Sequence, residues 1–321
     1  MRRAILLVSV PVLLLVLVAL PATGHAATPA PSCFGKAATV VGSGEVTGTA
    51  ANDVIVGSSG VDRIDGRGGN DLICALHGDD TVQGGLGNDS LDGGGGNDFM
   101  NGDSLSFQAV DLACRGGNDR LIGGPGDDLL AGDCTVETDD ATKGHISGSG
   151  GNDTIDAGAG SDLVAGDHNG NVVSASGGND TLDGGAGDDF VNGDSVSANL
   201  VSGTSGNDAV SGSGSADFVA GDSIVLSCDG RITAPGGNDS VNGGAGDDAP
   251  LIGDHFLICG VPTGRSGNDT LSGNSGDDGL HGDNYTDTGD PVFDSGEGSD
   301  HCSGGVGTDS AARCERAVGI P

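Results

Sequence analysis

Apolar side chains recur at every ninth position over much of the chain, separated by glycine and polar residues. The spacing is unbroken from Ile55 to Met100, and the later apolar positions come in pairs that are again nine residues apart. The regular apolar positions are Ile55, Ile64, Ile73, Val82, Leu91, Met100, Leu121, Leu130, Ile155, Val164, Leu182, Val191, Val210, Val219, Val241, Leu271 and Leu280. Three positions of this register are exceptions. Pro250 stands at one of them, and the next residue, Leu251, is expected to fill the apolar position; Cys302 and Ala311 stand at the last two. We expect one side chain of each nonapeptide to point into a core.

An aspartate stands two residues before each of these positions. The aspartates in this register are Asp53, Asp62, Asp71, Asp80, Asp89, Asp98, Asp119, Asp128, Asp153, Asp162, Asp180, Asp189, Asp208, Asp217, Asp239, Asp248, Asp269, Asp278, Asp300 and Asp309. The glycines that precede them permit tight turns with positive φ. Each nonapeptide therefore reads as a turn of about six residues followed by a short extended segment.

Two nonapeptides form one coil of 18 residues. The short strands of one coil pair with those of the next, about 4.8 Å away. The sequence therefore predicts an all-β fold, a parallel β-roll or β-solenoid with a thin aliphatic core, turns on both edges and variable loops inserted on one edge.

The repeats also predict how the chain is divided. Residues 53–103 are uninterrupted nonapeptides, and residues 104–299 are repeat pairs with loop insertions. Residues 36–52 are predicted to be an N-terminal cap, because Gly44 stands there in the register of the aspartates. Residues 300–321 are predicted to be a C-terminal cap, since repeat arrays need atypical ends.

A Gly-Asp dipeptide precedes each insertion, and we expect each insertion to form a loop or a hairpin. These aspartates, called the third column below, are Asp103, Asp133, Asp167, Asp194, Asp222, Asp254 and Asp283. Two interpretations stay open: they complete metal sites on the enlarged edge, or they cap the inserted loops.

The N-terminus has the features of an export signal. A basic start, an apolar run over residues 4–20 and small residues after it predict a signal peptide over residues 1–26, followed by a linker over residues 27–35. An uncleaved membrane anchor is the alternative, although Pro11 interrupts the run. We expect a secreted, extracellular protein with no membrane span after signal cleavage.

All eight cysteines follow the predicted signal peptide. An even number of cysteines in an exported chain predicts disulfides. We expect neighbouring cysteines to pair, as Cys33–Cys74, Cys114–Cys134, Cys228–Cys259 and Cys302–Cys314. Metal ligation by the thiolates is the alternative, which the lack of a C-x-x-C pair disfavours.

The charge of the chain restricts its partners. The formal net charge is −35 at pH 7, which repels nucleic acid and anionic lipid. A partner must therefore be cationic, and a multivalent metal ion is the simplest one.

The stacking of coils brings equivalent aspartates into columns. Two carboxylates about 5 Å apart repel by about 3 kcal/mol at an effective dielectric constant near 20. A cation that accepts many hard oxygen ligands in flexible geometry removes this repulsion, which favours Ca²⁺ over Mg²⁺ and Zn²⁺. Each aspartate would be half of a site that the next coil completes.

Three segments carry a resemblance to a known family: GGLGNDSLD at residues 84–92, GGPGDDLLA at 123–131 and GGNDTLDGGAGDDFV at 177–191. They resemble the G-G-x-G-x-D-x-U-x nonapeptide of RTX, or haemolysin-type, calcium-binding repeats. The resemblance implies a parallel β-roll in which multiple Ca²⁺ ions are held by the register aspartates and by backbone carbonyls of the glycine-rich turns. Unlike typical members exported by type I systems, this chain has a predicted signal peptide and eight cysteines.

The expected function is that of a calcium-folded structural, adhesive or surface-associated binding module. Besides calcium, we expect its partners to be glycans or proteins of a cell surface or extracellular matrix. The alternative is a carbohydrate-active enzyme that uses the loop-bearing edge, with loop carboxylates near Tyr285 or the histidine-bearing loops. No G-x-S-x-G or H-E-x-x-H motif is present, so no catalytic residue is predicted.

An ice-binding solenoid is a third possibility. It requires a flat, regular array of Thr or Asn, and the residue types between the glycines are too varied for such an array.

Overall fold

A computed structural model describes residues 30–108, 111–137, 144–227, 230–259, 263–286 and 298–320. From Pro31 on, these residues belong to one compact unit, Pro31–Pro321, and the described residues contain strands and turns without an α-helix. Within them there is accordingly no helix of the length and apolarity that a bilayer span requires. The predicted signal peptide lies outside the described residues.

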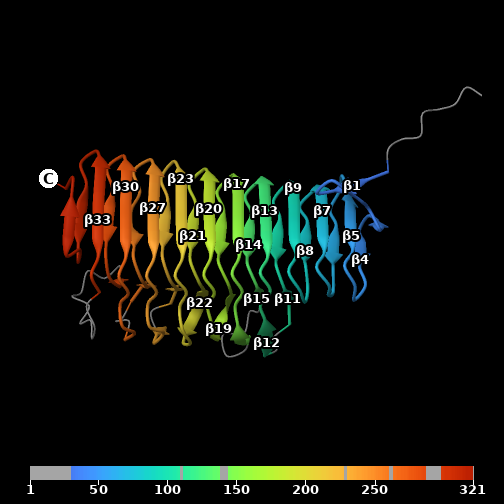
Figure 1. Cartoon of the computed structure of the whole chain (residues 1–321), viewed down its shortest axis with the longest axis horizontal. Helices are drawn as coiled ribbons and strands as arrows, with labels where there is room; N and C mark the ends of the chain where they lie inside the picture. Colours follow the sequence, from blue (N-terminus) through green and yellow to red (C-terminus); the bar gives the residue numbers. More distant parts are fainter. Residues whose placement is uncertain are drawn as a thin grey trace, which may run out of the picture. The chain divides into compact units, whose positions relative to one another are not determined.

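The first half of each coil contributes to a twelve-stranded sheet (Figure 1). Its strands, in sheet order, are β3 (Val40–Val41), β5 (Val54–Ser58), β7 (Leu72–His77), β9 (Ser90–Gly95), β13 (Arg120–Pro125), β17 (Thr154–Ala159), β20 (Thr181–Ala186), β23 (Ala209–Gly214), β27 (Ser240–Ala245), β30 (Thr270–Ser275), β33 (His301–Val306) and β35 (Arg316–Val318). Every pair is parallel and in repeat register, as in Ile155 opposite Leu182. Each regular strand begins one residue after a register aspartate.

The second half of each coil contributes to an eleven-stranded sheet. Its strands are β4 (Glu45–Thr47), β6 (Arg63–Asp65), β8 (Thr81–Gln83), β10 (Phe99–Asn101), β14 (Leu129–Ala131), β18 (Leu163–Ala165), β21 (Phe190–Asn192), β24 (Phe218–Ala220), β28 (Leu251–Ile252), β31 (Gly279–His281) and β34 (Ser310–Ala312). These strands are also parallel, as in Val164 opposite Val191. The predicted all-β parallel β-roll is therefore confirmed.

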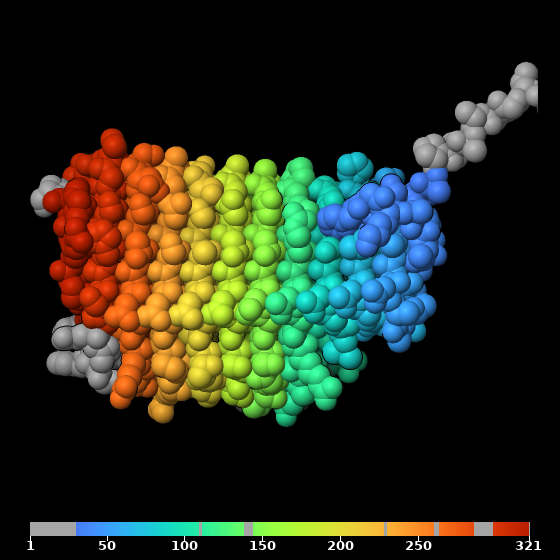
Figure 2. All heavy atoms as spheres, in the orientation of Figure 1, coloured from blue at the N-terminus to red at the C-terminus, as the bar shows by residue number. Residues whose placement is uncertain are grey.

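The core lies between these two sheets and is one aliphatic layer thick. The predicted apolar positions are buried in a single cluster that runs from Val46 to Cys302. Leu251 is fully buried beside Pro250, so the extra residue there restores the register. Figure 2 shows successive coils as adjacent bands in close contact along the stack.

The inserted segments are more regular than a set of loops or hairpins. They form a third sheet, called the insert sheet, whose strands pair in parallel from coil to coil (Figure 1). Its strands are β11 (Ser104–Ser106), β12 (Leu112–Arg115), β15 (Cys134–Val136), β16 (His145–Ser149), β19 (Asn169–Ser176), β22 (Val196–Val201), β25 (Ile224–Val225), β26 (Arg231–Ile232), β29 (Phe256–Leu257) and β32 (Tyr285–Thr286). Small aliphatic clusters around Ile146 and Ile232 support it. Stacking of the coils places each insert beside the next, so the backbone groups of the insert strands pair between coils.

The structure describes three of the four disulfides that were predicted between neighbouring cysteines. Bonds form between Cys33 and Cys74, Cys114 and Cys134, and Cys302 and Cys314. The first ties the antiparallel pair of β1 (Ser32–Cys33) and β2 (Lys36–Ala37) to the first coils. Cys259 is also disulfide-bonded, whereas its predicted partner Cys228 lies outside the described residues. The alternative of metal ligation by thiolates is wrong for the cysteines of these bonds.

Candidate metal sites

The register aspartates form two columns, one along each edge of the roll. The tight edge is the turn from the twelve-stranded to the eleven-stranded sheet; the insert edge is the opposite one, where the inserts leave. The insert-edge column contains Asp53, Asp71, Asp89, Asp119, Asp153, Asp180, Asp208, Asp239, Asp269 and Asp300. The tight-edge column contains Asp62, Asp80, Asp98, Asp128, Asp162, Asp189, Asp217, Asp248, Asp278 and Asp309. All twenty are buried.

One carboxylate oxygen of each aspartate is fixed by the neighbouring coil. The Asp71 N–H donates to Asp89 Oδ1 at 2.7 Å, and the Asp98 N–H donates to Asp128 Oδ1 at 2.7 Å. The same bond links successive aspartates throughout both columns. At the C-terminal end the Asp300 N–H donates to Glu315 Oε2 instead, at 2.5 Å.

The second oxygen of most of these aspartates has no hydrogen-bond partner in the described part of the chain. This holds for Oδ2 of Asp71, Asp80, Asp89, Asp98, Asp119, Asp128, Asp153, Asp162, Asp180, Asp189, Asp208, Asp217, Asp239, Asp248, Asp269, Asp278 and Asp309. Each side chain is at most 4% exposed. A buried anionic oxygen without a partner is strongly unfavourable, so a ligand or a proton is expected there.

The glycines of the turns leave a space beside these oxygens. A Cβ atom on Gly84 would collide with Asp89 Oδ2 and with the Gly102 carbonyl oxygen of the next coil. Equivalent collisions occur at Gly66, Gly132 and Gly193. Carboxylate and carbonyl oxygens of two successive coils thus face the same small space, and this all-oxygen donor set suits Ca²⁺.

The first coil differs from the others. Thr49 donates to Asp53 Oδ2 from its N–H at 2.7 Å and from its hydroxyl at 2.8 Å, and Ser58 donates to Asp62 Oδ2 at 2.6 and 3.0 Å in the same way. Burial alone would raise the pKa of Asp53, but hydrogen bonds from Thr49 and Thr39 outweigh it and lower that pKa. Both carboxylates are therefore supplied with hydrogen bonds by the protein itself.

Burial controls the electrostatics of the remaining columns. It raises the pKa of Asp98 to about 7 and that of Asp128 to about 6 on the tight edge. On the insert edge it raises the pKa of Asp119 to about 9 and that of Asp208 to about 10, with neighbouring carboxylates adding to the shift. The insert sheet covers this edge, which explains the stronger effect.

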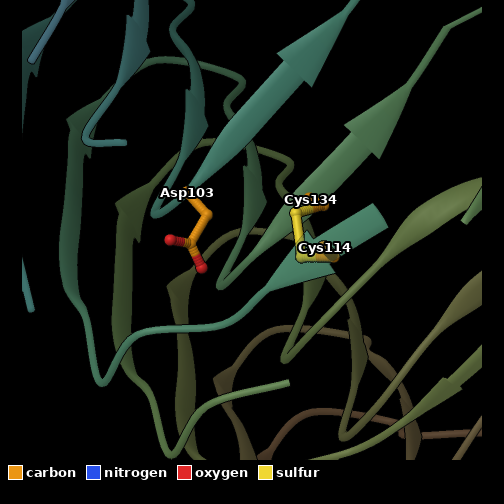
Figure 3. Close-up of side chains that lie close together, drawn as sticks. All are labelled: Asp103, Cys114 and Cys134. Atoms are coloured by element: carbon orange, nitrogen blue, oxygen red, sulfur yellow. A yellow bond between two sulfur atoms is a disulfide. The ribbon is translucent and has the colours of Figure 1, made fainter. Parts of the chain in front are cut away.

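The third column lies at the base of the inserts, beside the insert-edge column. The Gly117 N–H donates to Asp103 Oδ2 at 2.9 Å, and the Gly151 N–H donates to Asp133 Oδ2 at 3.0 Å, so these aspartates do close the inserts. Carboxylate oxygens of Asp103, Asp119 and Asp133 also lie within 4.8 Å of one another. Figure 3 shows Asp103 next to Cys114 and Cys134, whose disulfide is closed and leaves no thiolate for a metal ion.

The sequence interpretation missed a further hydrogen-bond ladder, formed by the Asn or Asp residues that precede many of the register aspartates. The Asn179 N–H donates to Asn152 Oδ1 at 2.8 Å, and the Asn207 N–H donates to Asn179 Oδ1 at 2.7 Å. The recurring Asn-Asp dipeptides were the signal for it. These exposed side chains pair the turns of successive coils and leave the buried carboxylates free for another ligand.

Comparison with known proteins agrees with this geometry. No curated protein gives a significant match to the chain. The family described as the RTX calcium-binding nonapeptide repeat (4 copies) matches residues 42–75, 78–104, 115–133, 144–167, 169–197, 197–223, 231–249 and 263–288, which together are more than half of the chain. The matched segments contain the glycine turns and nearly all of the aspartate columns. The chain belongs to the family of RTX calcium-binding nonapeptide repeats.

Proposed function

We propose that the protein is an exported structural module whose folded form is its calcium-bound form. The observation that carries this proposal is the pair of buried aspartate columns, in which most aspartates have one carboxylate oxygen without a hydrogen-bond partner among the described residues. Calcium would be held by these aspartates together with carbonyl oxygens of the glycine turns, and it would supply the positive charge that the columns need. Asp53 and Asp62 would contribute least, because Thr49 and Ser58 already bind their second oxygens.

Secretion is part of this proposal. The predicted signal peptide over residues 1–26 supports export, and the disulfides support an oxidising compartment. Calcium sites of extracellular modules act at high external calcium, which is compatible with a fold that depends on the ion.

A row of aromatic rings supports a role in binding a surface partner. Phe190 stacks on Phe218 with ring centroids 4.6 Å apart, Phe218 contacts Phe256 at 5.0 Å, and Phe256 stacks on Tyr285 at 5.8 Å. The row crosses from the eleven-stranded sheet to the insert sheet, and three of its four rings are partly exposed. The exposed parts of these rings offer an apolar surface against which sugar rings can pack, so we propose a cell-surface or extracellular glycan as the partner.

Calcium titration of the mature chain tests the proposal. We expect calorimetry to detect cooperative uptake of many ions and circular dichroism to detect a transition from coil to β-structure. Asp162→Asn, on the tight edge, should weaken uptake and lower the melting temperature; Asp156→Asn, exposed in the same coil, should leave both unchanged. A spectrum that is the same in millimolar calcium and in chelator would contradict the proposal.

The carbohydrate-active alternative is separated from simple binding by a second assay. Acidic glycans bound and released unchanged would support the adhesive role. Cleavage that disappears when one loop carboxylate is changed, but persists in Asp162→Asn, would favour the enzyme. The predicted carboxylates next to Tyr285 fall within residues 287–297, which lie outside the described residues.

A further inference from the structure

We infer that the insert edge carries a second series of divalent-cation sites, formed by the third column together with the insert-edge aspartates. The sites differ from the family repeat because they need the Gly-Asp dipeptides that precede the inserts. The inference rests on the proposed function in one respect: the insert-edge aspartates would contribute both to these sites and to the calcium sites of the family repeat.

Three groups of carboxylates show the arrangement. In each group one insert-edge aspartate faces two third-column aspartates of successive coils, and one oxygen from each residue lies within 4.8 Å of the others. The groups are Asp103 with Asp119 and Asp133, Asp133 with Asp153 and Asp167, and Asp194 with Asp208 and Asp222. All their side chains are buried, so water cannot screen the repulsion among them.

Closing the inserts leaves one carboxylate oxygen over in some aspartates of the third column, although Asp167 and Asp222 accept the glycine N–H with both oxygens. In Asp103 and Asp133 the oxygen Oδ2 accepts a glycine N–H, while Oδ1 has no hydrogen-bond partner within the described ranges. In Asp194 the Gly206 N–H donates to Oδ1 at 3.1 Å, and Oδ2 is the oxygen left over. The insert-edge members of the same groups, Asp119, Asp153 and Asp208, also have an oxygen, Oδ2, without a hydrogen-bond partner among the described residues.

A buried histidine provides an independent indication of a ligand. The His168 side chain is fully buried, and neither ring nitrogen has a hydrogen-bond partner among the residues that the structure describes. Its Nδ1 lies 3.8 Å from Asp133 Oδ2, beside the group of Asp133, Asp153 and Asp167. A metal ion bound in this group would lie beside this imidazole, whose ring nitrogens have no hydrogen-bond partner among the described residues.

The sequence of the inserts also favours a cation over a simple cap. Accepting a glycine N–H needs only a neutral oxygen, which Asn, Ser or Thr provides at turns. Nevertheless, all seven positions of the third column are aspartate. The oxygen-only carboxylate groups suit Ca²⁺, with shared protons as the competing explanation.

Asp133→Asn tests the inference, because the Asn Oδ1 atom can still accept the Gly151 N–H and Asp133 belongs to two groups. Bound calcium per mature chain is measured by equilibrium dialysis and elemental analysis at neutral pH. We expect the variant to lose about two ions, one for each group that contains Asp133. Asp128→Asn, on the tight edge of the same coil, is the matched control for the family sites, and Asp156→Asn is the exposed control.

The outcomes separate this inference from the proposed function. Unchanged calcium in Asp133→Asn, together with a loss in Asp128→Asn, overturns the second series alone; absence of calcium from the wild-type chain overturns both proposals. Infrared spectra of the calcium-loaded wild type give an answer even if the variant does not fold. Absence of the protonated carboxyl absorption at neutral pH supports the cation sites. Persistence of this absorption overturns them, because the carboxylates of the groups would then share protons and not a cation.

Discussion

After the first coil, each repeat carboxylate has two oxygens in different situations. Oδ1 accepts the N–H of the equivalent aspartate in the preceding coil, whereas Oδ2 faces a space that the turn glycine keeps open. A longer side chain at the aspartate position would not meet both conditions. A side chain at the glycine would fill the space itself. The aspartate and the first glycine of the turn are therefore one structural unit.

Gly84→Ala tests this unit. The new methyl group would collide with Asp89 Oδ2 and the Gly102 carbonyl oxygen, so we expect a loss of stability of about 1–3 kcal/mol and weaker calcium uptake. Urea unfolding in excess calcium and calorimetry measure the two effects. Gly60→Ala is the control, because a Cβ atom there would meet nothing within 4 Å. Equal behaviour of the two variants would show that the space is not needed.

The insert sheet shows that strands can pair regularly even though their own sequences have no repeating pattern. Its strands follow variable sequences, yet β16 and β19 pair over five residues in parallel because the roll holds them one coil apart. The Cys114–Cys134 bond ties the inserts of two successive coils at the end of this sheet. The roll therefore acts as a template, and the disulfide secures the first inserts that it aligns.

Removal of the Cys114–Cys134 bond should loosen the inserts and leave the roll intact. The bond joins residues 20 positions apart, for which the chain-entropy estimate gives a stabilisation of about 3 kcal/mol. In the Cys114→Ala/Cys134→Ala double variant we expect faster hydrogen exchange in β12, β15 and β16 and unchanged exchange in β14. Faster exchange in β14 as well would mean that the bond supports the whole stack.

At the scale of the whole unit, charge opposes the stack that hydrogen bonds and the aliphatic core build. A formal net charge of −35 is concentrated in part in buried columns, where burial raises the carboxyl pKa values. A cation or a proton relieves the same repulsion. Acid should therefore act on the metal-free chain in the direction opposite to ordinary acid denaturation.

The pH dependence follows from the direction of these shifts. A carboxyl group whose pKa is raised in the folded chain stabilises the fold while it is protonated; the stabilisation is complete below about pH 4 and is lost as pH rises through the folded pKa. For Asp128, Asp98 and Asp119 the folded pKa values are about 6, about 7 and about 9. In chelator we expect circular dichroism to report increasing β-structure as pH falls from about 9 to 4, with little pH dependence in excess calcium. A metal-free chain that loses structure on acidification would contradict this expectation.

The roll and both register columns could be predicted because their signal is local and repeats every nine residues. The insert sheet could not, since its pairing depends on coils that stack first and its own residues lack a period. The sequence also does not show that the second oxygen of Asp53 is already hydrogen-bonded by the protein. The donor, Thr49, stands four positions before Asp53. Ser213 has the same spacing to Asp217, but it donates to Asp183 instead. Spacing alone does not decide which acceptor a serine reaches.

The hydrogen-bonded aspartate columns make one full coil, which is two nonapeptides, the repeating unit of the structure. Along the uninterrupted repeats each N–H reaches a carboxylate 18 positions later, and an insert lengthens this step to 30 between Asp89 and Asp119 without breaking it. Duplicating or deleting a whole coil keeps the frame, whereas deleting a single nonapeptide would exchange the two edges for everything that follows. The chain can therefore vary in length during evolution by whole coils, and its inserts can diverge freely as long as each returns to the same turn.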